Sequence, residues 1–233
     1  MRKMAGTARA FPGGASCFGG THLSDTPDGP VTLGLTNPHA RALGELLPVL
    51  LCGEESAVLA FAHHAQSERW GPRARQDFAR IESDEARHTR WLLRLRASLP
   101  RPRTDIQTYR GLKHFFISLS SPDFGIHLGH IAALDSAVCL ILGRLRRTSA
   151  CAADARVRTV FELIHRDEAC HVAIARHYAG ELCETRGLMA CATEMRERLT
   201  TLLASHAKAF ETLEVCPDDL FKQLRTPPQR LFK

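Results

Sequence analysis

Two short segments place a glutamate and a histidine three residues apart, as Glu85-x-x-His88 and Glu168-x-x-His171. A carboxylate and an imidazole at this spacing lie on one face of an α-helix, one turn apart. In both segments they take positions where an apolar residue is expected, because apolar side chains recur at steps of three and four on either side. Burying an unpaired carboxylate is costly, so each pair needs a compensating partner. A metal ion is the simplest partner, and the segments predict a metal site.

Two further helical segments each interrupt their apolar stripe with one carboxylate. Glu54, and not its neighbour Glu55, falls on the first stripe, and Asp135 falls on the other. Glu54 lies 31 residues before Glu85, and Asp135 lies 33 residues before Glu168. Two long antiparallel helices with a short connection bring such residues to one level. The order carboxylate, E-x-x-H, carboxylate, E-x-x-H therefore predicts four helices around one site.

The elements that must position these residues are all predicted to be helical. Asn37-Pro38, Gly71-Pro72 and Ser121-Pro122 mark helix starts, and no segment shows convincing period-2 alternation. The fold class is therefore all-α. We expect an extended arm over 1–36, a helical bundle over 37–215 and a polar tail over 216–233. Within the bundle we expect helices over 37–70, 72–99, 122–145, 153–180 and 187–215. The crossover over 101–121 contains a short apolar patch, 115–117, for which we expect a helical turn or short helix.

The composition restricts the class of protein. The chain has 233 residues, a net charge of +6, and arginines spread along the helices, so a nucleic-acid-binding patch is not expected. No uninterrupted apolar run has the length of a membrane span, and the amino end has no signal-peptide core, although an organellar transit peptide is weakly allowed. The eight cysteines contain no C-x-x-C pair, so a zinc ribbon or a rubredoxin-type iron site has no support. A cytoplasmic protein without a membrane partner is expected.

The four interrupted stripes resemble the ligand helices of the ferritin-like di-iron carboxylate superfamily. Residues 53–65, G-E-E-S-A-V-L-A-F-A-H-H-A, are similar to the first ligand helix of bacterioferritins. Residues 82–88 and 166–171, E-S-D-E-A-R-H and R-D-E-A-C-H, look like its two E-x-x-H helices. The resemblance covers roughly 45–180 and implies a ferritin-like four-helix bundle, here with a long crossover and an additional C-terminal helix. Asp135 departs from the pattern, because most of the superfamily has glutamate there.

The resemblance also implies a site of two iron ions, with manganese or a mixed Mn/Fe pair as alternatives. Three glutamates and Asp135 supply four negative charges, which two divalent ions neutralise, and His with carboxylate ligands suits iron or manganese. Glu85 and Glu168 are expected to bridge the metals, and the other four ligands are expected to terminate them. His165, three residues before Glu168, is a candidate extra ligand, because arylamine N-oxygenases of this superfamily add a histidine from that helix at a spacing one residue longer. The predicted metal ligands are Glu54, Glu85, His88, Asp135, Glu168 and His171, with His165 as the candidate addition.

Other polar and aromatic residues receive structural interpretations. His63, His64, His127 and His130 are expected at the rim or the surface of the bundle, and Tyr178 is expected to pack in the core. Asp167 is given little weight as a partner of a ligand histidine.

Three functions are compatible with such a site. The first is an oxygenase or oxidase that activates dioxygen for a small organic substrate, with electrons from an external donor. The second is a ferroxidase or iron-storage subunit, and the third is a helical interaction module that has lost its metal. The apolar crossover and the long fifth helix favour the first, because they can build a substrate pocket beside the metals. The substrate stays open between a tRNA, an amine and a desaturase-type substrate, and a homodimer is allowed.

Overall fold

The computed structural model describes residues 32–102, 106–229 and 231–232. These residues form helices and no strands, so the predicted all-α class is confirmed. The arm predicted over 1–36 falls mostly outside the described residues. The helices are α2 (Asn37–Gln66), α3 (Pro72–Ala97), α4 (Ile106–Ile117), α5 (Phe124–Leu145), α6 (Ser149–Ala152), α7 (Ala155–Leu182), α8 (Thr185–Leu203), the 3₁₀ turn η1 (Ala204–His206), α9 (Ala207–Thr212) and α10 (Pro217–Arg225).

Side-chain caps fix where the long helices begin. The Thr36 hydroxyl accepts a hydrogen bond from the backbone N–H of His39 at the start of α2, and Pro38 occupies the first turn. Asp123 caps α5, and Asp154 caps α7, each by accepting bonds from two backbone N–H groups. Asp154 also accepts a bond from Gly34 N at 2.6 Å, which ties the described end of the arm to α7.

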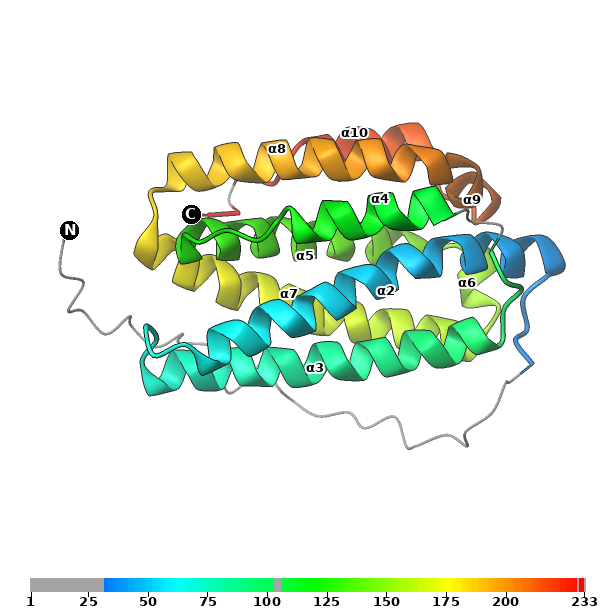
Figure 1. Ribbon diagram of the computed structural model, residues 1–233. Helices are drawn as coiled ribbons and strands as arrows, with labels where there is room; N and C mark the ends of the chain where they lie inside the picture. Colours follow the sequence, from blue (N-terminus) through cyan, green and yellow to red (C-terminus); the bar gives the residue numbers. More distant parts are fainter. Residues whose placement is uncertain (1–31, 103–105, 230, 233) are drawn as a thin grey trace.

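The four long helices pack as two hairpins. α2 packs along α3, and α5 packs along α7 (Figure 1). α8 lies on α5, and α10 packs on α8 at the top of the view in Figure 1. α4 contacts both α2 and α8. Each hairpin therefore contributes two helices to one interior, and α5 is covered on a further side by α8.

Buried Arg196 of α8 holds the covering helices in place. Its guanidinium donates to the carbonyl of Ala133 on α5, to the carbonyl of Leu224 on α10, and to the hydroxyl of Ser136 at 2.6 Å. Burial lowers the pKa of Arg196 to about 10, which still leaves it charged at neutral pH. These bonds satisfy the buried cation and join three helices.

Several predicted boundaries are wrong. The segment 216–233, expected to be a polar tail, contains α10, because Leu220 and Leu224 are one turn apart and bury one face of a short helix. The single fifth helix predicted over 187–215 is divided by η1 into α8 and α9. The apolar patch 115–117 of the crossover is helical, as expected for a helical turn or short helix, but the helix α4 that contains it begins earlier, at Ile106.

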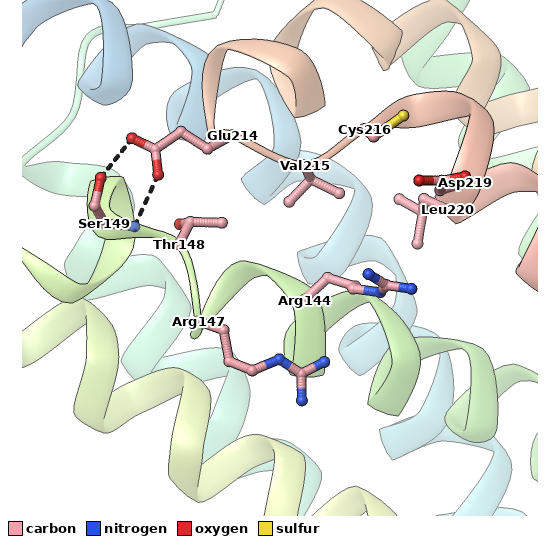
Figure 2. A pocket seen from close by; sticks show the side chains of 9 residues that line it. All are labelled: Arg144, Arg147, Thr148, Ser149, Glu214, Val215, Cys216, Asp219 and Leu220. Atoms are coloured by element: carbon pink, nitrogen blue, oxygen red, sulfur yellow. Dashed lines mark hydrogen bonds between the residues drawn. The ribbon is translucent and has the colours of Figure 1, made fainter.

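A polar turn closes the carboxyl-terminal side of α9. Glu214 has a left-handed φ of 62°, and its carboxylate accepts bonds from the backbone N–H and the hydroxyl of Ser149. Figure 2 shows these two bonds beside an open pocket of about 350 Å³, into which Arg144 and Arg147 also extend. None of the predicted metal ligands lines this pocket.

Two helices also have the length and hydropathy of membrane spans, namely α2 and α5. The core helices of soluble proteins pass the same test, and both helices pack within the bundle, with 67% of the α5 window buried. The observation is weak evidence for a membrane, but it qualifies the expectation from sequence that no span-length segment exists.

Candidate metal centre

The first cluster of ligand-type atoms joins three helices. One atom from each of its residues lies within 4.8 Å of the others, and each residue is at most 5% exposed. α2 supplies one carboxylate, α3 supplies a carboxylate and an imidazole, and α7 supplies the last carboxylate. The members are Glu54, Glu85, His88 and Glu168. The apolar residues on either side of each member bury these helix faces, which is why the polar groups meet inside the bundle.

The second cluster adds the third ligand helix. Asp135 of α5 and His171 of α7 lie within 4.8 Å of Glu168, and all three are buried. Glu168 belongs to both clusters, so the two are contiguous. The structure therefore brings all six predicted ligands together in one buried site.

The two imidazoles present the same nitrogen to the carboxylates. Nδ1 of His88 lies 3.1 Å from Glu54 Oε2, and 3.5 Å from both Glu85 Oε2 and Glu168 Oε1. Nδ1 of His171 lies 3.0 Å from Glu85 Oε1 and 3.8 Å from Glu168 Oε1. Glu85 and Glu168 thus each approach both histidines, which is the placement a bridging carboxylate requires.

The outer nitrogen of each histidine faces an aspartate from the opposite hairpin. Nε2 of His88 lies 3.3 Å from Asp167 Oδ2, and Nε2 of His171 lies 3.4 Å from Asp84 Oδ2. An Nε2–H that donates to a carboxylate leaves Nδ1 free to bind a metal. Arg87 contacts both aspartates and links the two pairs.

Sequence reasoning missed this arrangement. It gave Asp167 little weight, because adjacent positions of one helix point apart, and it did not consider Asp84. The two aspartates act on histidines of other helices, so the argument from a single helix did not apply. The available signal was the repeated order Asp-Glu-x-x-His, at 84–88 and at 167–171.

Burial and mutual repulsion oppose full ionisation of the carboxylates. Burial, then the charge of Glu85, raises the pKa of Glu54 well above its usual range. Burial, then the charge of Glu168, does the same for Asp135. Burial would also raise the pKa of Glu85, but His171 beside it lowers that pKa below its ordinary value. A concentration of four carboxylates in a dry interior is stable only with cations or protons among them.

Three polar atoms at the centre lack hydrogen-bond partners within the described part of the chain. They are Glu85 Oε1, Asp135 Oδ2 and His171 Nδ1. The first and last are 3.0 Å apart but are not aligned for a hydrogen bond with each other. Buried polar groups are nearly always satisfied, so converging orphan atoms indicate an absent partner. Carboxylate oxygens and imidazole nitrogens are metal ligands, and the buried Glu and His groups can hold a metal ion.

His165 lies outside both clusters. Its ring packs near Gly143 of α5, and burial together with Arg146 and Arg147 lowers its pKa. A side chain one turn before Glu168 on α7 would reach the metal site only if its ring turned inward. The ring of His165 instead turns towards the carboxyl-terminal part of α5. The structure does not place His165 among the metal ligands.

The expected surface placement is wrong for two histidines. His64 is fully buried and accepts a hydrogen bond from Trp70 Nε1, and His127 is 8% exposed with its ring 5.0 Å from that of His64. Burial, and the neighbouring histidines, lower the pKa of His64 to about 3 and that of His127 to about 4. Tyr178 packs in the core as expected, and its hydroxyl donates to Asp77 at 2.8 Å.

The chain matches no protein-family model, no curated protein and no solved structure. The resemblance to the ferritin-like superfamily therefore depends on the residues themselves and on the geometry of the site.

Proposed function

We propose that the protein is a ferritin-like oxidoreductase that uses two metal ions, iron by preference, to activate dioxygen and oxidise a small organic substrate. One observation carries the proposal: four carboxylates and two histidines meet in the interior of two packed hairpins, and three of their polar atoms have no hydrogen-bond partner among the described residues. Two divalent cations would neutralise the carboxylates and satisfy those atoms.

The residues divide into three roles. Glu85 and Glu168 approach both histidines and would bridge the metals. Glu54 with His88, and Asp135 with His171, would each complete one metal's coordination. When bound, the two ions supply electrons and open coordination positions for dioxygen. Asp84 and Asp167 keep the proton on Nε2 of the histidines, and the surrounding apolar side chains exclude water from the site.

A second candidate function is a ferroxidase, which oxidises iron itself. One observation favours it, because the cavity beside the carboxylates has a volume of only about 40 Å³. That space suits dioxygen or an alkyl end of about one or two carbons, whereas a larger organic substrate would require side chains on the cavity wall to move.

Anaerobic titration of the metal-free protein with Fe(II) tests the proposal. We expect two equivalents per chain in the native protein, and the same in Glu55→Ala, which changes an exposed carboxylate beside Glu54. Glu168→Ala is expected to bind neither equivalent. Fewer than one equivalent in the native protein would contradict the metal centre.

Admission of oxygen to the loaded protein separates the two functions. Oxidation of two irons per chain without a mineral product, in a small assembly, supports the oxygenase. Continued iron uptake with growth of a mineral inside a large hollow assembly would replace the oxygenase by the ferroxidase. Absorbance, oxygen uptake and analytical ultracentrifugation provide the three measurements.

A further inference from the structure

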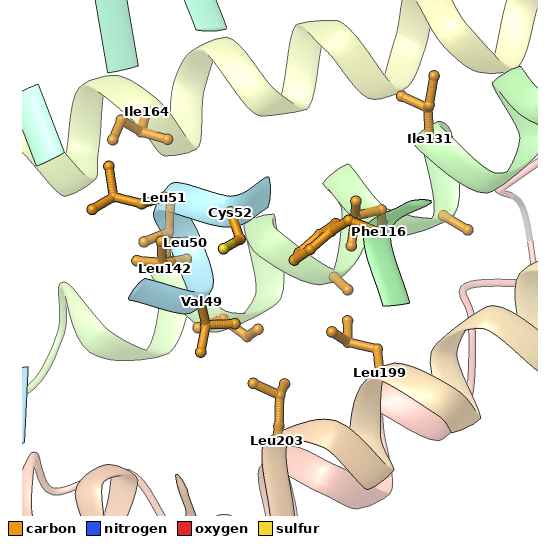
Figure 3. Close-up of a cluster of buried hydrophobic side chains, with 14 of the residues drawn as sticks. Val49, Leu50, Leu51, Cys52, Phe116, Ile131, Leu142, Ile164, Leu199 and Leu203 are labelled. Carbon is orange, nitrogen blue, oxygen red and sulfur yellow. The ribbon is translucent and has the colours of Figure 1, made fainter. Parts of the chain in front are cut away.

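The cavity next to the carboxylates has an almost wholly apolar wall. Its apolar lining comes from α2, α4, α5 and α8. Four carboxylates of the candidate metal centre also line it, namely Glu54, Glu85, Asp135 and Glu168. The other lining residues include Val49, Leu134, Phe116, Leu199 and Leu203, and none carries a polar side chain. In the close-up of this cluster in Figure 3, Phe116, Val49, Leu199 and Leu203 surround a common space. The crossover and the fifth helical segment, predicted to build a pocket beside the metals, contribute Phe116 and the two leucines.

The apolar wall of the cavity favours uncharged, apolar groups over polar ones. Its only polar groups are the four carboxyl groups, which the proposed metals would occupy. A charged or hydrogen-bonding group inside the cavity would lose its water without gaining a partner, which is unfavourable. An alkyl group would lose nothing and would gain contacts with the lining.

Phe116 sets the width of the cavity. Its ring lies against Gly53 of α2, where an added Cβ would stand 3.5 Å from the ring edge. Phe116 is 6% exposed, so the ring fills space inside the wall instead of extending into solvent. The remaining volume of about 40 Å³ is far below the roughly 150 Å³ of an apolar cavity that accepts benzene.

We propose that this cavity is the substrate pocket of the protein, that it takes an uncharged alkyl end of about one or two carbons and excludes an aromatic ring, and that Phe116 limits its width. The assignment of the bound molecule as a substrate rests on the proposed oxygenase function. The binding of an apolar molecule in the cavity does not itself require metal.

Ligand-dependent melting of the full-length protein tests the pocket without any activity measurement. The probes are ethane under pressure, benzene near its solubility limit, and sodium benzoate at the concentration of benzene. A ligand that binds only the folded state raises the melting temperature, and we expect a rise of about 1–2 °C with ethane and none with benzene or benzoate. In Phe116→Ala we expect benzene to become stabilising as well, because removal of the ring enlarges the cavity.

A matched control lies next to Phe116. Ile117 is 71% exposed on the same helix, so Ile117→Ala removes a comparable apolar group from the solvent side. We expect it to retain the native ligand pattern. Leu199→Ala opens the opposite wall and is expected to gain benzene binding, which keeps the test available if Phe116→Ala does not fold.

The outcomes separate this proposal from the metal centre. Stabilisation by benzoate equal to that by ethane, or by benzene equally in the native protein and in both cavity variants, would overturn the pocket. Fe(II) binding is measured on the same samples. Loss of the ligand pattern with two irons bound would refute the pocket alone, whereas the expected pattern without iron binding would refute the oxygenase and leave the apolar pocket.

Discussion

The two hairpins carry the same order of polar residues but do not build equal halves of the site. In the α2–α3 hairpin, Glu54 reaches His88 at 3.1 Å. In the α5–α7 hairpin, Oδ2 of Asp135 has no hydrogen-bond partner among the described residues. Both carboxylates are buried, and the side chain of Asp135 is one methylene shorter than that of Glu54, which we propose as the cause of the difference.

This inequality has a consequence for metal binding. The first cluster offers four ligand-type residues, and the second offers three, with Glu168 common to both. A metal ion held by more ligands at shorter distances is bound more tightly. We therefore expect two binding steps of unequal affinity, with the weaker one at Asp135 and His171.

The largest effect is expected from replacing Glu168, the residue that both halves of the site share. Glu168→Gln should weaken both binding steps by more than about 100-fold, beyond the effect of losing a supporting residue. Glu55→Gln, on the solvent side of α2, is the control. Calorimetry or competition with a chelator measures the two steps. Loss of only one step would show that Glu168 serves a single metal and that the halves are independent.

The aspartates behind the histidines should have the next largest effect. Asp167→Asn and Asp84→Asn should each reduce metal affinity by about 10–100-fold, because the histidine loses the acceptor that fixes its ring. Asp167 should matter more, since its side chain is 5% exposed against 13% for Asp84, and it binds Arg166 in addition to Arg87, which contacts both aspartates. Although burial alone would raise it, the pKa of Asp167 is lowered to about 2 by His88 and Arg166. An effect on the same step from both variants would contradict their assignment to different histidines.

Exchange of the two carboxylate lengths tests the cause of the inequality. Asp135→Glu should tighten the weaker step several-fold, and Glu54→Asp should weaken the stronger step by a similar factor. The double variant should reverse the order of the halves. If Asp135→Glu leaves the weaker step unchanged, the backbone position of α5, and not the side-chain length, limits that half.

The smallest expected effect concerns the imidazoles that face each other across the hairpins. His64 on α2 and His127 on α5 are neutral when folded, with pKa values of about 3 and about 4. In the unfolded chain these two histidines bind protons below about pH 6.5. The stability that depends on their being neutral is therefore complete above that pH and is lost as the pH falls towards 4. The groups that face them are His63, His130 and Arg69, the last through the Phe124 ring.

Replacement of His127 measures this contribution. Between pH 7 and pH 5, His127→Gln should lose about 1–2 kcal/mol less unfolding free energy than the native protein. Urea denaturation at constant metal content provides the measurement, with the exposed His114→Gln as control. An equal loss in the native protein and in both variants would show that the pair does not titrate on unfolding.

The sequence was sufficient to predict the helices that carry the site. Apolar residues at steps of three and four fixed which carboxylates point inward, and Glu54 is buried while Glu55 is exposed. The ends of the helices were harder to predict. α10 is short, and its apolar face is evident only against α8, which a one-dimensional pattern does not contain.

Contacts between helices explain the remaining errors. Asp84 is not identified from the sequence, and Asp167 is given little weight, because each acts on a histidine of the other hairpin, at sequence separations of 87 and 79 residues. His64 and His127 were placed at the surface because histidine is commonly exposed, yet an aromatic group with Trp70 and Phe124 encloses them. Periodicity identifies the face of a helix, but it does not identify the residues that the face meets.

The reciprocal pairing of Asp84 with His171 and of Asp167 with His88 makes the two hairpins interdependent. Neither hairpin expressed as a separate fragment would contain both a histidine and the acceptor that orients it. Mixing two such fragments would restore both pairs at once, so metal uptake by the mixture would report the reassociation of the halves.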